Sequence, residues 1–208
     1  MKTLSHTVFL VDDDEDVCDA LQMLLWAAGF AVESFPSALA FLERRDQQAV
    51  GCIVADVRMP GVSGLQLLER LAAEGERLPV VVITGHGDVS ACRRAFKGGA
   101  VDFLTKPVDE QVLIEAIETG FTRLEAQRRE TSEADEARAL LARLTQRENE
   151  ILDMVARGWM TKEIARVMGV SPRTVETHRA NLAEKLGTTS VAEMVRLVLL
   201  ARPTHTPP

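Results

Sequence analysis

A single carboxylate, Asp56, stands where an apolar segment of the chain gives way to a loop. Residues 52–55 are apolar and indicate a strand buried on both faces, whereas Pro60, Gly61 and Gly64 prevent that strand from continuing. Aspartate is a poor strand residue and is costly to bury. Its position at the end of this strand therefore indicates a chemical role.

Three further apolar runs of the chain each lead into polar side chains. These runs are residues 8–11, 80–83 and 101–104, which lead into Asp12 and Asp13, into Thr84, and through Thr105 into Lys106. In an open parallel sheet, ligands bind outside the carboxyl ends of the strands. We therefore expect Asp56 and these polar side chains to converge at one edge of a sheet.

The expected group combines three carboxylates with a lysine and a hydroxyl. Carboxylates at short range repel one another unless a cation neutralises them, and Mg²⁺ fits because it needs only one or two carboxylates and keeps several waters. Lys106 and Thr84 would complete a clamp for the oxygens of a phosphoryl group during its transfer. Asp56, alone on the central strand, is the best candidate for a residue that becomes an aspartyl phosphate.

The elements that must position this group alternate between strand and helix. An additional strand is expected at 31–34, and helical patterns follow the five strands at residues 15–28, 36–45, 65–74, 88–97 and 109–121. This alternation predicts an α/β fold, a doubly wound five-stranded parallel sheet over residues 1–122. Residues 123–142 are rich in charge and lack glycine and proline, which predicts a solvated helical linker.

Residues 143–202 show helical patterns only and predict an all-α domain of four helices. Thr145 opens a capping-box sequence, Thr161 is expected to cap the second helix, and Ser171 with Pro172 begins the third. Two short helices joined by a tight turn at Gly169 fit a helix-turn-helix. Residues 203–208 are expected to form a tail.

The third helix of this domain, residues 171–186, has a face that could read DNA. Thr177 and Ala180 point away from the expected core and are small enough to let the helix approach base edges. Four basic residues could contact phosphates without reading sequence, namely Lys162, Arg173, Arg179 and Lys185. The alternative is a helical bundle with solvated basic side chains, and Glu176 favours that alternative.

Charge is distributed unevenly along the chain, which has a net charge of −7. Residues 143–208 carry +3 and the remainder carries −10, so nucleic acid is a candidate partner only for the second domain. No apolar run approaches the roughly 18 residues of a membrane span. Three scattered cysteines indicate neither disulfides nor a zinc site and are expected to pack as small buried residues, so we expect a cytoplasmic protein without a membrane partner.

Two stretches of the sequence resemble known families. Residues 5–122 resemble a response-regulator receiver domain at Val11–Asp14, Asp56–Gly61, Ile83–Asp88 and Asp102–Pro107. Residues 140–202 resemble the LuxR-type DNA-binding domain at Leu144–Glu148, Thr161–Ala165, Val170–Asn181 and Lys185–Leu186. Together they resemble the FixJ/NarL class of two-component response regulators.

The receiver resemblance implies specific roles. Asp56 would accept phosphate from the phosphohistidine of a sensor histidine kinase, and Thr84 and Lys106 would grip the phosphoryl oxygens. Phe103 would be the aromatic switch residue, although it lacks the hydroxyl that many receivers have there. The Mg²⁺ environment would be formed by Asp12, Asp13, Asp56 and the main-chain carbonyl of Arg58.

The LuxR-type resemblance implies that the helix of residues 171–186 enters the major groove. The last helix, around Val191, Met194 and Val198, would pair two copies of the chain. Glu176 stands where many members of the family carry lysine. The residues expected to contact DNA are Lys162, Arg173, Thr174, Glu176, Thr177, Arg179, Ala180, Asn181 and Lys185.

These expectations combine into a phosphorylation-controlled transcriptional regulator. Phosphorylation at Asp56 would bias the receiver surface around residues 88–121 and release or dimerise the second domain on double-stranded promoter DNA. RNA polymerase is a candidate partner. We expect no enzyme activity beyond the receiver's own phosphorylation and dephosphorylation.

Two alternatives stay open at this stage. One is a DNA-binding regulator whose receiver acts without phosphorylation. The other is a phosphate-metabolising enzyme with an aspartyl nucleophile, although Arg58 stands where dehalogenase-like phosphatases carry their second acid.

Overall fold

The structure, a computed structural model, describes residues 7–44, 50–76, 78–85 and 89–202. The chain divides into two compact units, Met1–Ala126 and Gln127–Pro208, which we term the N-terminal unit and the C-terminal unit. The predicted tail at 203–208 and the expected first residue of the fourth helix, Asp88, lie outside the described residues.

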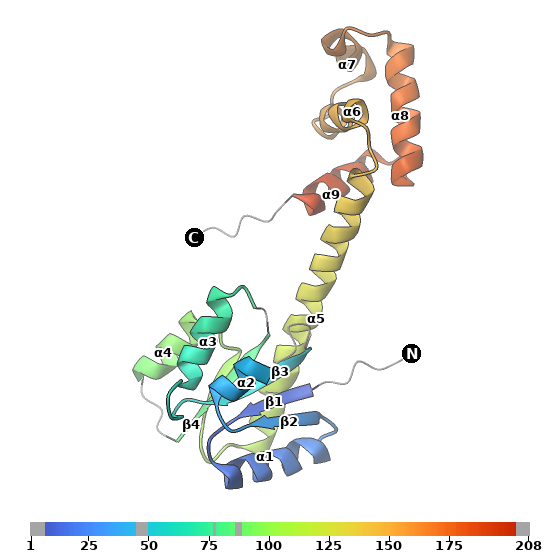
Figure 1. Cartoon of the computed structure of the whole chain (residues 1–208). Coiled ribbons are helices and arrows are strands. Elements are labelled where there is room, and N and C mark those ends of the chain that lie inside the picture. Colours follow the sequence, from blue (N-terminus) through green and yellow to red (C-terminus); the bar gives the residue numbers. More distant parts are fainter. Residues whose placement is uncertain (1–6, 45–49, 77, 86–88, 203–208) are drawn as a thin grey trace. The chain divides into compact units, whose positions relative to one another are not determined.

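The N-terminal unit is built on a five-stranded sheet (Figure 1). Its strands are β1 (Thr7–Val11), β2 (Ala31–Phe35), β3 (Gly51–Asp56), β4 (Val80–Thr84) and β5 (Asp102–Thr105). The strand order is β2-β1-β3-β4-β5 and every neighbouring pair is parallel, which confirms the predicted doubly wound sheet. Parallel pairing brings the carboxyl ends of β1, β3, β4 and β5 to one edge.

Helices cover both faces of this sheet (Figure 1). They are α1 (Glu15–Ala27), α2 (Ala38–Arg44), α3 (Gly64–Ala73), α4 (Val89–Lys97) and α5 (Glu110–Leu141). The apolar side chains of α1 and α5 pack on one face, and those of α2, α3 and α4 pack on the other. All six residues of β3 are buried, as the continuous apolar run predicts.

Local capping explains one difference from the predicted boundaries. The helix expected from Pro36 begins two residues later, at Ala38, because the Ser37 hydroxyl accepts a hydrogen bond from the Ala40 amide at 3.1 Å and supplies the first-turn cap. Among the cysteines, Cys18 and Cys52 are buried as expected, whereas Cys92 on α4 is half-buried.

Helix α5 is a single helix of 32 residues. Its first half buries Leu113, Ile117 and Phe121 in the N-terminal unit. Residues 125–132 are all exposed, and Ala137 is then buried in the core of the C-terminal unit with only 1% of its surface accessible. The segment predicted as a linker therefore contributes to the second core.

The C-terminal unit contains four further helices, α6 (Gln146–Ala156), α7 (Thr161–Met168), α8 (Pro172–Leu186) and α9 (Val191–Ala201). Their apolar faces form one core with the end of α5. The Thr145–Glu148 capping box and the start of α8 at Ser171 and Pro172 are confirmed. In the part of the chain that the structure describes, no helix combines the length and apolarity needed to cross a bilayer.

The expected cap of α7 is wrong. Met160, and not Thr161, precedes the first helical residue, and the Glu163 carboxylate accepts a hydrogen bond from the Met160 amide at 2.8 Å. Thr161 is the first helical residue, and its hydroxyl accepts a hydrogen bond from Arg179 of α8 at 3.3 Å. The hydroxyl therefore joins two helices of the helix-turn-helix and does not cap one.

Candidate functional site

A polar pocket lies at the carboxyl edge of the sheet. The Lys106 ammonium is 2.7 Å from Oδ2 of Asp12 and 2.8 Å from Oδ1 of Asp56, although 94 positions separate Lys106 from Asp12. Both carboxylates are buried, with 4% and 5% of their residue surface exposed. Lys106 therefore bridges two buried acids that come from the ends of β1 and β3.

Backbone hydrogen bonds fix this arrangement. The Arg58 amide donates to Oδ2 of Asp56, and the Asp14 amide donates to Oδ1 of Asp12 at 3.1 Å. The Lys106 amide donates to the Thr84 carbonyl at 2.7 Å, which ties the end of β5 to the end of β4. Because each carboxylate has one oxygen held by a main-chain donor and the other by Lys106, both are oriented before any ligand arrives.

Electrostatics keep Lys106 charged. Partial burial of the ammonium would lower its pKa, but the hydrogen bonds to Asp12 and Asp56 and the charges of both carboxylates outweigh burial and raise the pKa above its ordinary value. Lys106 is therefore positively charged at neutral pH and is held between the Asp12 and Asp56 carboxylates.

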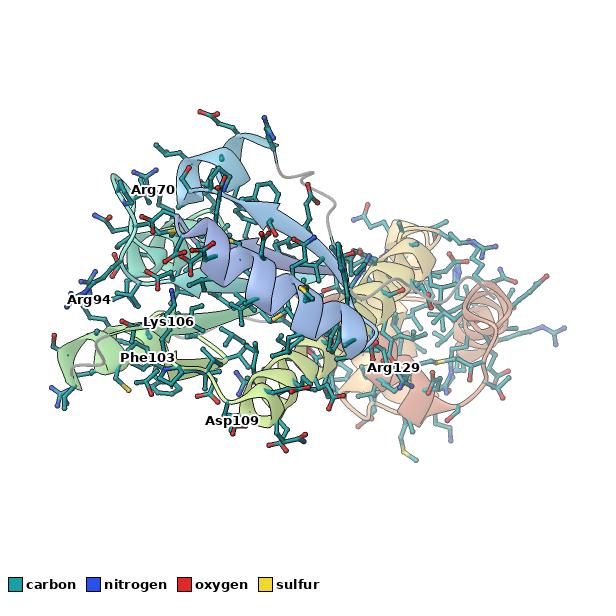
Figure 2. The ribbon with its side chains drawn as sticks, turned by 90° about the horizontal axis from the view of Figure 1, so that it is seen from below. Arg70, Arg94, Phe103, Lys106, Asp109 and Arg129 are labelled. Carbon is teal, nitrogen blue, oxygen red and sulfur yellow. The ribbon has the colours of Figure 1, made fainter. Side chains whose placement is uncertain are left out.

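The other predicted receiver residues lie on or next to strands β1, β4 and β5. Thr84 is fully buried at the end of β4, and Asp13 is exposed beside Asp12. Phe103 is half-buried and packs against the core on the side of α3 and α4. Phe103 and Lys106 are labelled in Figure 2, where Arg94 of α4 lies on the same side of the unit.

The carboxylates of this pocket fit a Mg²⁺ ion that takes only a few of its ligands from the protein. The described residues contain no group of three or more acidic, histidine or cysteine side chains that could hold a metal, and the predicted part of Asp13 in the Mg²⁺ environment stays a prediction. Two buried carboxylates nevertheless suffice for Mg²⁺, which takes one or two carboxylates and keeps its remaining ligands as waters.

Helix α8 carries the second candidate site. Val175, Leu182 and Leu186 are buried, as predicted. The opposite face is exposed and bears predicted DNA contacts, namely Arg173, Glu176, Thr177, Ala180 and Asn181, and Lys162 is exposed on α7. Thr174 is half-buried, and its hydroxyl lies 2.9 Å from that of Ser171.

Two of the predicted phosphate contacts already have partners inside the C-terminal unit. Arg179 donates to Thr161, as described above. The Lys185 ammonium is 2.6 Å from Oε2 of Glu148, a residue of α6 that is only 3% exposed. Lys185 thus forms an ion pair with a buried carboxylate, whereas Arg173 and Lys162 are exposed.

The residues expected to pair two copies through α9 need correction. Met194 and Val198 are 5% and 8% exposed because they pack into the core of their own unit. The apolar side chains that α9 presents outward are Val191 and Leu199, which are 42% and 60% exposed.

Glu148 gives the stability of the C-terminal unit a specific pH dependence. Hydrogen bonds from Lys185 and from the Thr145 amide lower the Glu148 pKa from 4.5 to about 2. Since the folded pKa is the lower one, its contribution is complete above about pH 4.5 and is lost as the pH falls towards about 2. We expect Glu148→Gln to destabilise this unit at neutral pH and to reduce its loss of stability over this range.

Urea unfolding at stepped pH measures this effect through Trp159, in a Trp26→Phe background that leaves one tryptophan, in the C-terminal unit. Glu184→Gln, at an exposed position on α8, is the control and should keep the wild-type pH profile. An unchanged pH profile in Glu148→Gln would contradict the assignment.

Comparisons with known proteins identify a family for each of the two units. The response regulator receiver domain family matches residues 8–118, and the luxR family of bacterial regulatory proteins matches residues 142–198. The transcriptional regulatory protein FixJ of Azorhizobium caulinodans is 44% identical over 95% of this chain and 93% of its own length. The response regulator protein TmoT of Ectopseudomonas mendocina is 38% identical over 95% and 90%.

Solved structures give the same result for the fold. The response regulator StyR matches with a TM-score of 0.84 and 44% identity, over 94% of this chain and 98% of that chain. Full-length FixJ from B. japonicum matches with a TM-score of 0.59 and 39% identity, over 96% and 98%. The chain therefore belongs to the FixJ family of transcriptional response regulators, in which a receiver domain is joined to a LuxR-type DNA-binding domain.

Proposed function

We propose that Asp56 accepts a phosphoryl group from the phosphohistidine of a sensor histidine kinase and that this reaction controls DNA binding. The observation that carries the proposal is the placement of Lys106 between two buried, oriented carboxylates, Asp12 and Asp56. A carboxylate oxygen of Asp56 forms a bond to phosphorus while the P–N bond of the phosphohistidine breaks. The electron pair of that bond stays on the imidazole nitrogen.

The surrounding side chains supply charge and position for this transfer. Lys106 neutralises negative charge on the transferred oxygens, and the Arg58 amide keeps the Asp56 carboxylate in one orientation. Mg²⁺ would be held by Asp12 and Asp56, with Asp13 and the Arg58 carbonyl nearby, and would neutralise further charge on the phosphoryl oxygens when bound. We assign Thr84 and Phe103 the switch between the unmodified and phosphorylated states, biasing the surface around residues 88–121.

The output is binding of double-stranded promoter DNA by α8. Thr177 and Ala180 would approach base edges, and Arg173 and Lys162 would contact phosphates, because all four are exposed. The exposed apolar face of α9 at Val191 and Leu199 is the surface we assign to pairing of two copies, with RNA polymerase as a further candidate partner. The proposal places the chain in the cytoplasm and gives it no enzyme activity on other substrates.

DNA binding before and after phosphorylation tests the proposal. Wild type treated with acetyl phosphate and Mg²⁺ is expected to bind a labelled duplex, selected by wild type from a random pool, about tenfold more tightly and to dimerise. Asp56→Asn should show neither change. Asp109→Asn is the matched control. Asp109 is an exposed acid at the start of α5 (Figure 2) that accepts a capping hydrogen bond from the Val112 amide. Asparagine at this position can accept the same hydrogen bond.

Two results would contradict the proposal. Phosphorylation that leaves DNA affinity and oligomeric state unchanged in wild type would favour the regulator whose receiver acts without phosphorylation. Mg²⁺-dependent turnover of a phosphate ester, lost in Asp56→Asn, would favour the aspartyl-nucleophile enzyme.

A further inference from the structure

The last turn of α8 is attached to the first turn of α6 by one buried carboxylate. Oε2 of Glu148 accepts a hydrogen bond from the Thr145 amide at 2.7 Å and lies 2.6 Å from the Lys185 ammonium. The Thr145 hydroxyl in turn accepts from the Glu148 amide at 3.3 Å. Glu148 thus connects the capping box of α6 to a residue 37 positions later, next to the last residue of α8.

The burial of Glu148 makes this attachment difficult to exchange for a DNA contact. The Glu148 side chain is 4% exposed and the Lys185 side chain 33% exposed. If Lys185 turned to a phosphate, it would leave a buried carboxylate without its cation, and separating such a pair is strongly unfavourable. Arg173 is exposed, so turning its side chain to a phosphate would leave no buried carboxylate without its cation.

We infer that Lys185 is a positioning residue, which fixes the C-terminal end of α8 against α6 through Glu148 and makes no phosphate contact. The inference rests on the proposed function in one respect, namely that α8 is the helix that binds DNA. A second attachment acts on the same helix from another side, because Arg179 donates to Thr161 of α7 at 3.3 Å. The exposed face with Thr177 and Ala180 is therefore presented by a helix held at its middle and at its end.

The salt dependence of DNA affinity separates positioning from phosphate contact. Each lost phosphate contact lowers the slope of log affinity against log salt by about 1. We expect Lys185→Met to weaken binding of the duplex selected by wild type about tenfold with the wild-type slope. Arg173→Met, at the exposed start of α8, is the comparator and should lower the slope by about 1.

A double-mutant cycle with Glu148→Gln tests whether Lys185 acts through Glu148. If it does, Lys185→Met should add little to the effect of Glu148→Gln, both in DNA affinity and in urea unfolding of the C-terminal unit followed by Trp159. Lys185→Arg, which retains the cation, should recover most of the affinity. These comparisons remain informative if Lys185→Met alone lowers stability.

Two outcomes would overturn the inference. One is a slope reduced by about 1 in Lys185→Met, and the other is an unfolding effect of Lys185→Met that is the same with and without the Glu148 carboxylate. If wild type selects no duplex at all, the proposed function fails, and the unfolding cycle still decides whether Lys185 acts through Glu148.

Discussion

Replacing Gly64 with alanine is expected to destabilise the N-terminal unit by about 3 kcal/mol and to slow phosphorylation of Asp56. A Cβ at position 64 would lie 2.3 Å from the Asp56 carbonyl oxygen and 3.0 Å from its carbonyl carbon. Both are backbone atoms of a buried strand and cannot rotate away, so the end of β3 must shift. The predicted phosphoacceptor would shift with it.

Unfolding by urea, followed by Trp26 in a Trp159→Phe background, measures the loss of stability in the N-terminal unit alone. Incorporation of phosphate from acetyl phosphate measures the second effect. Gly85→Ala is the matched control, because a Cβ there meets nothing within 4 Å and the Gly85 backbone needs no positive φ; it should stay within about 0.5 kcal/mol of wild type. A Gly64→Ala protein as stable as this control would refute the close approach.

Replacing Ala137 with glutamate is expected to destabilise the C-terminal unit by about 3 kcal/mol, because it places an unpaired charge among apolar side chains. Ala137 is 1% exposed and lies in the same core as Ile151, Val175 and Leu197. One helical turn before Ala137, the Glu133 carboxylate of α5 lies 3.5 Å from the Arg196 guanidinium of α9. A region that only connected two domains would tolerate this substitution.

Ala139→Glu provides the control, since Ala139 is exposed on the same turn of α5 and the substitution adds the same charge to the same helix. It should change stability by no more than about 0.5 kcal/mol. The measurement is urea unfolding followed by Trp159 in the Trp26→Phe background. Equal midpoints for the two variants would show that the end of α5 does not stabilise this unit.

The acid pocket was predictable because it depends on topology. Asp12, Asp56, Thr84 and Lys106 each follow an apolar run, and parallel pairing of those runs forces their ends to one edge whatever the loops do. Buried helix positions such as Val175 and Leu182 were predictable for a similar reason, because a 3.6-residue period determines which side chains share a face.

Other features depend on contacts between distant residues, which neither period nor spacing reveals. The sequence of α8 indicates that Lys185 is an ordinary surface lysine, and only the structure shows that Glu148 of α6 lies against it. Met194 and Val198 are apolar residues that serve equally well in a core or at an interface, and only the packed unit shows that they are in the core. Ala137 is too small to stand out in a charged segment, so its burial was not predictable from periodicity.

The exposed middle of α5 affects how the two units are connected. Residues 125–132 are exposed throughout, whereas the helix on either side is anchored in a core. A helical stretch this short is marginal in water by itself, so its helix–coil equilibrium lies close to balance and depends on the anchored ends. It can therefore melt locally at a free-energy cost far below that of unfolding either core. The length and the stiffness of the connection between the two units therefore depend on whether residues 125–132 are helical.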